Sequence, residues 1–415
     1  MDGLELFTTA LGLGEAWRVS QAEFDEESGR LDLRVVYSRG SRFSCSEPGC
    51  GQNKCPVHDT VEKSWRHLDF FQHKAFLHAR VPRVRCPEHG VRLVVVPWAR
   101  PGSGFTMLFE ALVLTFAKAM PMRKVAETVR EYDTLVWRIV EYHVNAARAK
   151  EDFSAVRRVG MDETAARRGQ DYISLFADLD AGRVLFATEG RDGGTVERFA
   201  ADLAAHGGDP KQVDTTSSDM SAAFIAGIRQ HLPNAQLTFD RFHLAAKLSE
   251  AVDAVRRHEI ASRPELKHTR WLWLKNWANL STRQRQELQL LLRPSAQLAT
   301  ARALRWREDF QAFYDQHPSY AAEYLRSWCA GAKRSRLQPI KDFVDLVRRH
   351  WDGIIAWHES RVSNGLLEGI NSLIQAAKAR ARGYRNKDKI ITIAYLIAGK
   401  LPLPTVTNPR LALAH

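Results

Sequence analysis

The spacing of hydrophobic residues changes twice along this chain. Between residues 105 and 150, apolar residues recur at helical spacing, as in "FTMLFEALVLTFAKAM". From about residue 155 to residue 240, strand-like runs alternate with helical runs and turn residues separate them. Residues 241 to about 360 contain no convincing strand, and residues 362 to 398 are again helical. The pattern therefore predicts a multidomain α/β protein.

The N-terminal 150 residues are predicted to hold a hairpin and a helix pair. "AWRVSQAEF" and "RLDLRVVY" alternate in polarity around the turn "DEESG", after a short helix. In "MPMRKVAETVREYDTLVWRIVEYHV", Pro121 starts one helix, and Asp133 or Thr134 caps the next. This helix-turn-helix form would place the second helix in a DNA major groove, although helical hairpins are common. Three apolar residues of the first helix would pack on three of the second: Val125, Ala126 and Val129 on Val136, Ile139 and Val140.

The order of elements from residue 155 predicts a particular sheet. Strand "RRVGM" ends at Asp162, and "DYISLFADLD" and "RVLFATEG" follow as a meander. A helix, the strand "KQVDTTSS", a second helix and the strand "AQLTF" complete the domain. This is the order of a ribonuclease-H-like mixed sheet, in which the fourth strand lies beside the first.

Net charge and composition narrow the class of partner. The 415 residues carry a formal charge of +12, an excess typical of proteins that bind nucleic acid, although it also serves solubility. We find no run of 18 uncharged apolar residues, so no membrane span or membrane partner is expected. Acidic residues near the N-terminus argue against a signal peptide and predict a cytoplasmic protein.

Cysteine and histidine cluster between residues 45 and 89. Without a secretory signal, clustered cysteines are more often metal ligands than disulfides. Two matching knuckles, Cys55–x–x–His58 and Cys86–x–x–His89, have the spacing that presents two ligands to zinc, and Cys45 and Cys50 form a looser pair. Six candidates for four places leave the set open, with Cys86 and His89 preferred; the alternative is small buried cysteines with incidental histidines. We expect a structural Zn²⁺.

Carboxylates at strand ends predict a second metal site. Asp162 follows one strand, Asp219 follows another, and Glu368 lies in the first turns of a helix with Asn371 on the same face. Oxygen ligands suit a pair of Mg²⁺ ions, which can clamp the attacking and leaving oxygens of a phosphodiester. The simpler alternative is that each acid is a helix cap or a surface charge. Glu163 would point to the opposite side of the sheet.

"TFDRFH" offers a competing acid. Asp240 and His243 could hold a metal, or Asp240 could cap a helix. In the predicted sheet, Asp219 lies one strand spacing from Asp162, about 4.8 Å, whereas Asp240 lies two spacings away, about 9.6 Å. The geometry favours Asp219, and Asp240 and His243 then support the site from beside it, together with Asn371.

A basic segment follows Glu368. Residues 361–389 contain seven basic residues against two acids, within which "KARARGYRNKDK" is expected to follow DNA phosphates rather than form only a solvated helix face. The DNA-binding candidates are Arg123, Lys124, Arg138, Lys378, Arg380, Arg382, Arg385 and Lys387.

Three segments carry a family resemblance. "VGMDETAARRGQDYISLFADLDAGRVL", "SSDMSAAFIAGIRQHLPNAQLTFDRFHLAAKL" and "SNGLLEGINSLIQAAKARARGYRN" resemble the transposases of the ISL-three family of bacterial insertion sequences, and "WRHLDFFQHKAFLHARVPRVRCPEHGVRLVVVPWAR" resembles that family's zinc-binding region. The resemblance implies that Asp162, Asp219 and Glu368 are a catalytic triad. Asp240 and His243 match a Cys-or-Asp–x–x–His signature of related families. The spacing of Cys45 and Cys50 and the polar "TTSSDM" depart from the family pattern.

The resemblance also implies a domain plan. From Asp219 to Glu368 is 149 positions, which an all-helical insertion accounts for. One of its seven tryptophans could stack on an extruded base, although most are expected in the core. The expected parts are a zinc-binding domain (1–100), a helix-turn-helix region (101–153), a ribonuclease-H-like core (154–243), the insertion (244–360), the last core helices (361–400) and a loose tail (401–415).

The expected function is that of a DNA transposase. It would bind terminal inverted repeats and catalyse strand cleavage and transfer with Mg²⁺ or Mn²⁺, as a homodimer or higher assembly on DNA in a bacterial, nucleoid-associated setting. The alternatives are a non-transposing nuclease of the same fold and a DNA-binding regulator derived from a transposase.

Overall fold

The computed structural model describes residues 3–167, 171–293 and 297–409. Its contacts divide the chain into two compact units, Met1–Lys150 with Leu401–His415, and Glu151–Lys400. No helix within the described ranges is both long and apolar enough to cross a membrane.

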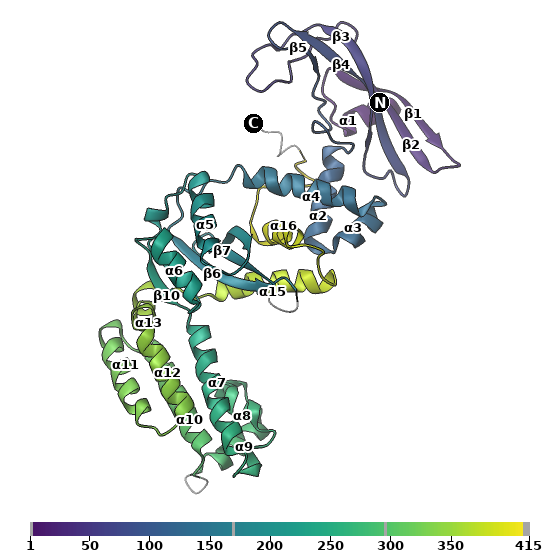
Figure 1. The fold of residues 1–415 in the computed structure, drawn as a ribbon. Helices are drawn as coiled ribbons and strands as arrows, with labels where there is room; N and C mark the ends of the chain where they lie inside the picture. Colours follow the sequence, from purple (N-terminus) through teal and green to yellow (C-terminus); the bar gives the residue numbers. More distant parts are fainter. Residues whose placement is uncertain (1–2, 168–170, 294–296, 410–415) are drawn as a thin grey trace. The chain divides into compact units, whose positions relative to one another are not determined.

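The first unit contains a five-stranded sheet with the order β1-β2-β4-β3, and β5 pairs with β4 (Figure 1). The predicted hairpin is confirmed, because β1 and β2 pair antiparallel from Trp17↔Tyr37 to Asp25↔Arg30. The sequence pattern did not predict β3 to β5. The elements are α1 (Gly3–Ala10), β1 (Trp17–Asp25), β2 (Arg30–Tyr37), β3 (Val57–Arg66), β4 (Lys74–Cys86) and β5 (Gly90–Leu93).

Three helices follow the sheet: α2 (Met107–Ala119), α3 (Met122–Val129) and α4 (Asp133–Arg148). Pro121 occupies the N-cap of α3, as predicted. The predicted cap of α4 is wrong, because Tyr132 occupies the N-cap and makes no side-chain capping bond. Arg130, in the left-handed conformation, ends α3 only three residues before α4 begins at Asp133. Asp133 instead adds negative charge to the first turn of α4, where the helix dipole favours it. All six apolar residues expected between α3 and α4 are buried.

The predicted loose tail is wrong for its described part. Leu401 and Leu403 are 7% and 5% exposed, and residues from Leu401 onward group with the first unit. Burying two leucines gives this segment a packing role that its Pro-rich composition does not reveal.

The second unit is built on a sheet with the order β10-β9-β6-β7-β8. The meander β6-β7-β8 is antiparallel, and β9 and β10 add in parallel beside β6. Asp162 does not end its strand as predicted, because pairing with β7 continues to Ala165↔Tyr172 after pairing with β9 stops at Gly160↔Ser217. The strands are β6 (Arg158–Ala165), β7 (Tyr172–Asp178), β8 (Arg183–Glu189), β9 (Thr215–Ser218) and β10 (Gln236–Phe239).

Helices cover both faces of this sheet (Figure 1). On one face, Val159 and Met161 of β6 share a core with Phe199 of α5 and with α6. On the other, Gly160 lies so close to α15 that an added Cβ would stand 2.7 Å from Leu367 Cδ1. Because side chains alternate along β6, one face of the strand packs against α5 and α6 and the other faces α15. The helices are α5 (Gly194–Ala205), η1 (Pro210–Gln212), α6 (Ala222–His231), α15 (Gly365–Arg380) and α16 (Lys387–Ala398).

Between β10 and α15, the described residues form helices and no strand. They share one core, in which Trp273, Phe310 and Phe313 are fully buried, whereas Trp271 and Trp277 are exposed. The helices are α7 (Arg241–Glu259), η2 (Pro264–Leu266), α8 (Arg270–Leu274), η3 (Trp277–Asn279), α9 (Thr282–Leu291), α10 (Ala299–Gln311), η5 (Ala312–Asp315), α11 (Pro318–Lys333), α12 (Gln338–Arg349), α13 (Trp351–Ile355) and α14 (Trp357–Ser360).

Candidate functional site

Three aspartates lie side by side at one edge of the second sheet. The register pairs Gly160 with Ser217 and Ser218 with Phe239. Continued by one or two residues, it brings Asp162, Asp219 and Asp240 to the same level on adjacent parallel segments. The Asp240 N–H donates to Ser218 O at 3.2 Å, which extends the β9–β10 pairing to this level.

Helix α15 carries Glu368 to the same edge. Asn371 Nδ2 donates to Asp162 Oδ2 at 2.6 Å, and Gln375 Nε2 donates to Thr164 Oγ1 at 2.7 Å. Lys378 Nζ donates to Ala165 O at 2.5 Å. These donors are spaced by about one helical turn and meet β6 in order at Asp162, Thr164 and Ala165, so they fix the helix along the strand. Glu368, in the first turn, is set one turn before Asn371.

Asn364 joins the start of α15 to the strands. It is 1% exposed, its Oδ1 accepts from Ser217 Oγ at 2.6 Å, and its N–H donates to Asp240 Oδ1 at 3.4 Å. Asn364 was not among the predicted site residues. The "SNG" before a helical run was the available signal, although it indicates a helix start rather than a bond to a strand.

Burial and mutual repulsion perturb the acids. The pKa of Asp162 is raised to about 6, chiefly by burial and also by the charges of Asp219 and Asp240, while the backbone N–H of Glu163 and the charge of His243 oppose the rise. Burial, and after it the charge of Asp240, raises the pKa of Glu368, and His243 again opposes. His243 therefore acts on both Asp162 and Glu368 from the first turn of α7. A cation at this edge would relieve the same repulsion.

Glu163 is perturbed on the opposite face. Burial raises its pKa to about 7, followed by the charge of Asp219. Asp219 therefore influences the acids on both faces of β6. The alternation rule predicted the direction of Glu163 but not this coupling.

Asp240 occupies the N-cap of α7 without capping it through its side chain. The residue is 3% exposed, and its Oδ2 has no hydrogen-bond partner among the described residues. Asn371 Oδ1 is likewise buried without a partner there. Buried carboxylate and amide oxygens of this kind are unusual unless they serve a ligand. These two oxygens beside Asp162 therefore point to a polar or cationic ligand at this edge of the sheet.

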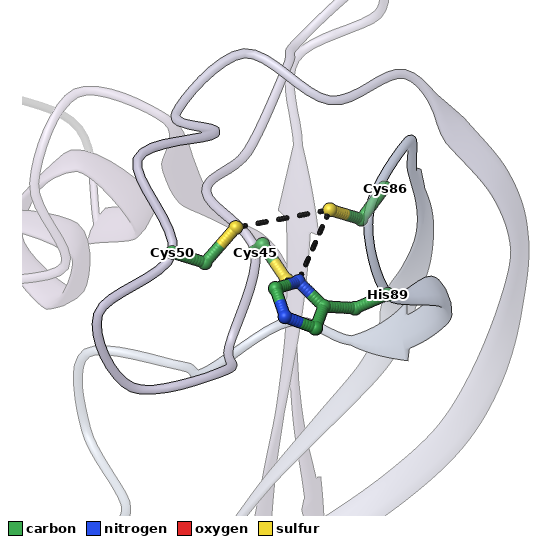
Figure 2. Close-up of side chains that lie close together, drawn as sticks. All are labelled: Cys45, Cys50, Cys86 and His89. Carbon is green, nitrogen blue, oxygen red and sulfur yellow. Dashed lines mark hydrogen bonds between the residues drawn. The ribbon is translucent and has the colours of Figure 1, made fainter.

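In the first unit, Cys45, Cys50, Cys86 and His89 converge (Figure 2). Their ligand atoms all lie within 4.8 Å of one another. Cys50 Sγ lies 3.8 Å from Cys86 Sγ, which lies 3.6 Å from His89 Nδ1. A zinc tetrahedron with ordinary bond lengths has edges of about 3.6 to 3.8 Å, so the spacing fits zinc.

The other two zinc candidates lie outside this group of four, although Cys55 is close enough to Cys86 for that sulfur, after burial, to raise its pKa. Cys55 is 3% exposed, and its Sγ lies 3.8 Å from Gln52 O. His58 Nδ1 lies 3.4 Å from Asp59 Oδ2, in a pair at the surface. Neither belongs to the group of four that converges, so the matching form of the two knuckles did not distinguish them.

The basic candidates divide by what they contact. Arg123 and Lys124 are exposed and pair with Glu127, and Arg138 is exposed on α4. Lys378 bonds to β6, and Lys387 bonds Asp171 and Glu189, so both serve the fold. Three further arginines are exposed: Arg380, Arg382 and Arg385.

Comparisons with known families cover all three regions. Residues 159–394 match a transposase family model, residues 94–144 match the helix-turn-helix domain of transposase family ISL3, and residues 42–89 match the zinc-finger of transposases IS204, IS1001, IS1096 and IS1165. The zinc-finger match and the Cys/His cluster together support a structural zinc ion.

Whole-chain relatives agree with these matches. The transposase for insertion sequence element IS1557 of Mycobacterium tuberculosis is 28% identical over 440 residues and covers 97% of each chain. The transposase for insertion sequence element IS1001 of Bordetella parapertussis is 27% identical over 392 residues, covering 91% of this chain and 94% of its own.

Proposed function

Because the chain belongs to transposase family ISL3 and is a DNA transposase, we propose that Asp162, Asp219 and Glu368 are its catalytic acids. The bond from Asn371 to Asp162 carries the proposal, because it ties the helix that bears Glu368 to the strand that bears Asp162. The register of β6 and β9 adds Asp219 at the same level.

Asp162, Asp219 and Glu368 would hold two Mg²⁺ or Mn²⁺ ions, with Asp162 shared. Such ions stabilise the attacking and leaving oxygens of a phosphodiester in strand cleavage, and again when a 3′-OH joins target DNA. Asn371 orients the Asp162 carboxylate through its 2.6 Å bond. Asp240 and His243 set the local charge around Asp162 and Glu368, as the pKa directions of both acids indicate.

We further propose a ribonuclease-H-like core with an all-helical insertion after β10. The strand order β8-β7-β6-β9-β10 and the return of the chain to β6 through α15 support it. In the first unit, Cys45, Cys50, Cys86 and His89 would be the zinc ligands. The zinc-binding and helix-turn-helix regions would bind terminal inverted repeats, with the protein assembled as a dimer or higher on DNA.

The test is a cleavage and joining assay on the full chain. Labelled duplexes carry the inverted repeats that flank the gene, and a supercoiled plasmid serves as target, with and without Mg²⁺. Asp162→Ala, Asp219→Ala and Glu368→Ala should each lower cleavage at least about a thousandfold while end binding persists. The matched control is Asp214→Ala, since Asp214 is exposed at the opposite end of β9. Full cleavage by any triad variant would refute the triad.

The same assay separates the alternatives. A nuclease of this fold would cut the ends but leave a precleaved end unjoined. A regulator would bind the ends without Mg²⁺-dependent cutting.

A further inference from the structure

A cleft in the second unit runs from the acidic edge to the helical region. Its cavity of about 760 Å³ is lined by Glu368 and Asp240 at the acids and by Trp271 and Tyr314 from the helices. Pockets that enclose small ligands measure roughly 300 to 1,000 Å³, so the space suits a nucleotide rather than a duplex.

Four residues of the cleft have buried polar atoms that bond to nothing in the described ranges. These atoms are Asp240 Oδ2, Arg307 Nε, Tyr314 Oη and Trp357 Nε1, and each residue is at most 9% exposed. Burial raises the pKa of the Tyr314 hydroxyl well above its usual range, so it remains a hydrogen-bond donor. More than nine in ten buried polar groups normally have a partner, and four exceptions around one cleft point to a polar ligand.

The mouth of the cleft is aromatic and basic. Trp271 is 57% exposed and Phe242 is 59% exposed, although most tryptophans of this region are buried or partly buried. The Arg270 guanidinium lies 5.1 Å from the Trp271 ring centroid, and Arg241 lies 5.1 Å from the Tyr314 ring centroid. Exposed rings beside guanidinium groups are the usual platform for bases of single-stranded DNA.

We propose that this cleft takes one unpaired nucleotide of the DNA strand beside the cleavage site. Its base stacks on Trp271, and its edge reaches the buried donors of Tyr314 and Trp357 and the Asp240 acceptor. The proposal rests on the proposed function, because Glu368 lines the same cleft. Holding one nucleotide out of the duplex places the neighbouring phosphate at the acids and restricts which position is cut.

The first test is independent of cleavage. The full chain is bound in Ca²⁺ to end duplexes that carry 5-iodouracil at one position each across the cleavage junction, and is then irradiated. We expect crosslinking at one or two adjacent positions, mapped to the peptide that contains Trp271. Crosslinks at every position alike, or none at Trp271 or Phe242, would overturn the proposal.

The second test measures cleavage in Mg²⁺. Trp271→Ala should cut a fully paired end about ten- to a hundredfold more slowly, because a stacked base contributes that much. Trp271→Phe should recover most of the rate, and a mismatch at the crosslinked position should shrink the Trp271→Ala defect, since unpairing then costs less. Trp277→Ala is the control, because Trp277 is 44% exposed in the same region but does not line the cleft.

These outcomes distinguish a failure of the catalytic proposal from a failure of the nucleotide-site proposal. A wild-type chain that crosslinks at Trp271 but never cuts in Mg²⁺ leaves the cleft occupied and removes the catalytic proposal. A wild-type chain that cuts, with Trp271→Ala and Trp277→Ala equally active, overturns only the nucleotide site.

Discussion

The Cys/His cluster and the acid cluster bring their side chains together in opposite ways. Cys45, Cys50, Cys86 and His89 come from two short segments, and their ligand atoms all lie within 4.8 Å of one another. The acids come from separate strands and a helix more than 200 positions apart in sequence, and they repel one another. A cluster whose four ligands fit one tetrahedron suits a structural ion that belongs to the fold. The acid cluster is held by hydrogen bonds to neighbouring residues although its charges repel one another, so the binding of a cation there would relieve repulsion rather than form the fold.

Burial shifts the pKa of one side chain in each unit, in opposite directions. In the first unit, His67 is partly buried, and burial lowers its pKa to about 4. In the second unit, burial raises the pKa of Asp162 to about 6. Lowering the pH should therefore reduce the stability of the first unit through His67 and remove the destabilising charge of Asp162 in the second unit.

The largest expected effect is loss of zinc. Cys86→Ser should abolish stoichiometric zinc and unfold the zinc-binding region, because structural zinc contributes about 10 kcal/mol or more in small domains. Zinc content by mass spectrometry and hydrogen exchange of β4 measure this. Cys55→Ser is the matched control and should retain zinc. Equal zinc loss in both variants would redefine the ligand set.

Acid should destabilise the first unit next. As pH falls from about 6.5 towards 4, the unfolded His67 takes a proton that the folded one refuses, so up to about 3 kcal/mol is lost. Hydrogen exchange of β4, corrected for intrinsic rates, follows this loss. His67→Gln should flatten the response, and an unchanged pH profile would contradict the assignment to His67.

A side chain that pushes α15 away from β6 should lower the free energy of unfolding by about 1 to 3 kcal/mol. In Gly160→Ala, the new Cβ meets Leu179 and Leu367 at 2.7 Å. Urea unfolding should show the loss, and end cleavage should fall as Glu368 moves with the helix. Gly369→Ala in the same helix meets nothing within 4 Å and should be neutral or stabilising. A Gly160→Ala protein with full cleavage would show that the contact does not hold the site.

The smallest effect has the opposite sign. Asp162→Asn removes a charge that the fold disfavours, so stability in Mg²⁺-free buffer at pH 7 should rise by about 1 to 2 kcal/mol. Because the folded pKa is raised, the gain should shrink as pH falls from about 6 towards 4. Urea unfolding at several pH values checks it. A loss of stability would mean that Asp162 is satisfied by local bonds alone.

Local patterns in the sequence predicted much of this molecule. Alternation gave the β1–β2 hairpin, and Pro121 gave the start of α3. The order of elements led to the expectation that β9 lies beside β6, and from that to the choice of Asp219 over Asp240. The pKa of Asp162 agrees in direction, because Asp219 raises it more than Asp240 does.

What escaped prediction depends on contacts between distant segments. The extension of β6 beyond Asp162 arises from its partner β7, not from its own residues. Asn364 is of a residue type that commonly caps helices, but its side chain accepts a hydrogen bond from Ser217, 147 positions away. The knuckle Cys86–x–x–His89 was predicted, but its partners were left open: Cys45 and Cys50 meet it across 44 and 36 positions of sequence. No local pattern records such partners.

The attachment of α15 to β6 has a consequence for how this chain can vary. Gly160 with Leu367, and the bonds made by Asn371, Gln375 and Lys378, involve no residue between β10 and α15. Apart from Asn364 at its end, the helical segment before α15 takes no part in these contacts, so its length can vary without moving Glu368. We expect a chain cut within that helical segment to keep both faces of the α15–β6 contact, so its two fragments, when produced together, should associate.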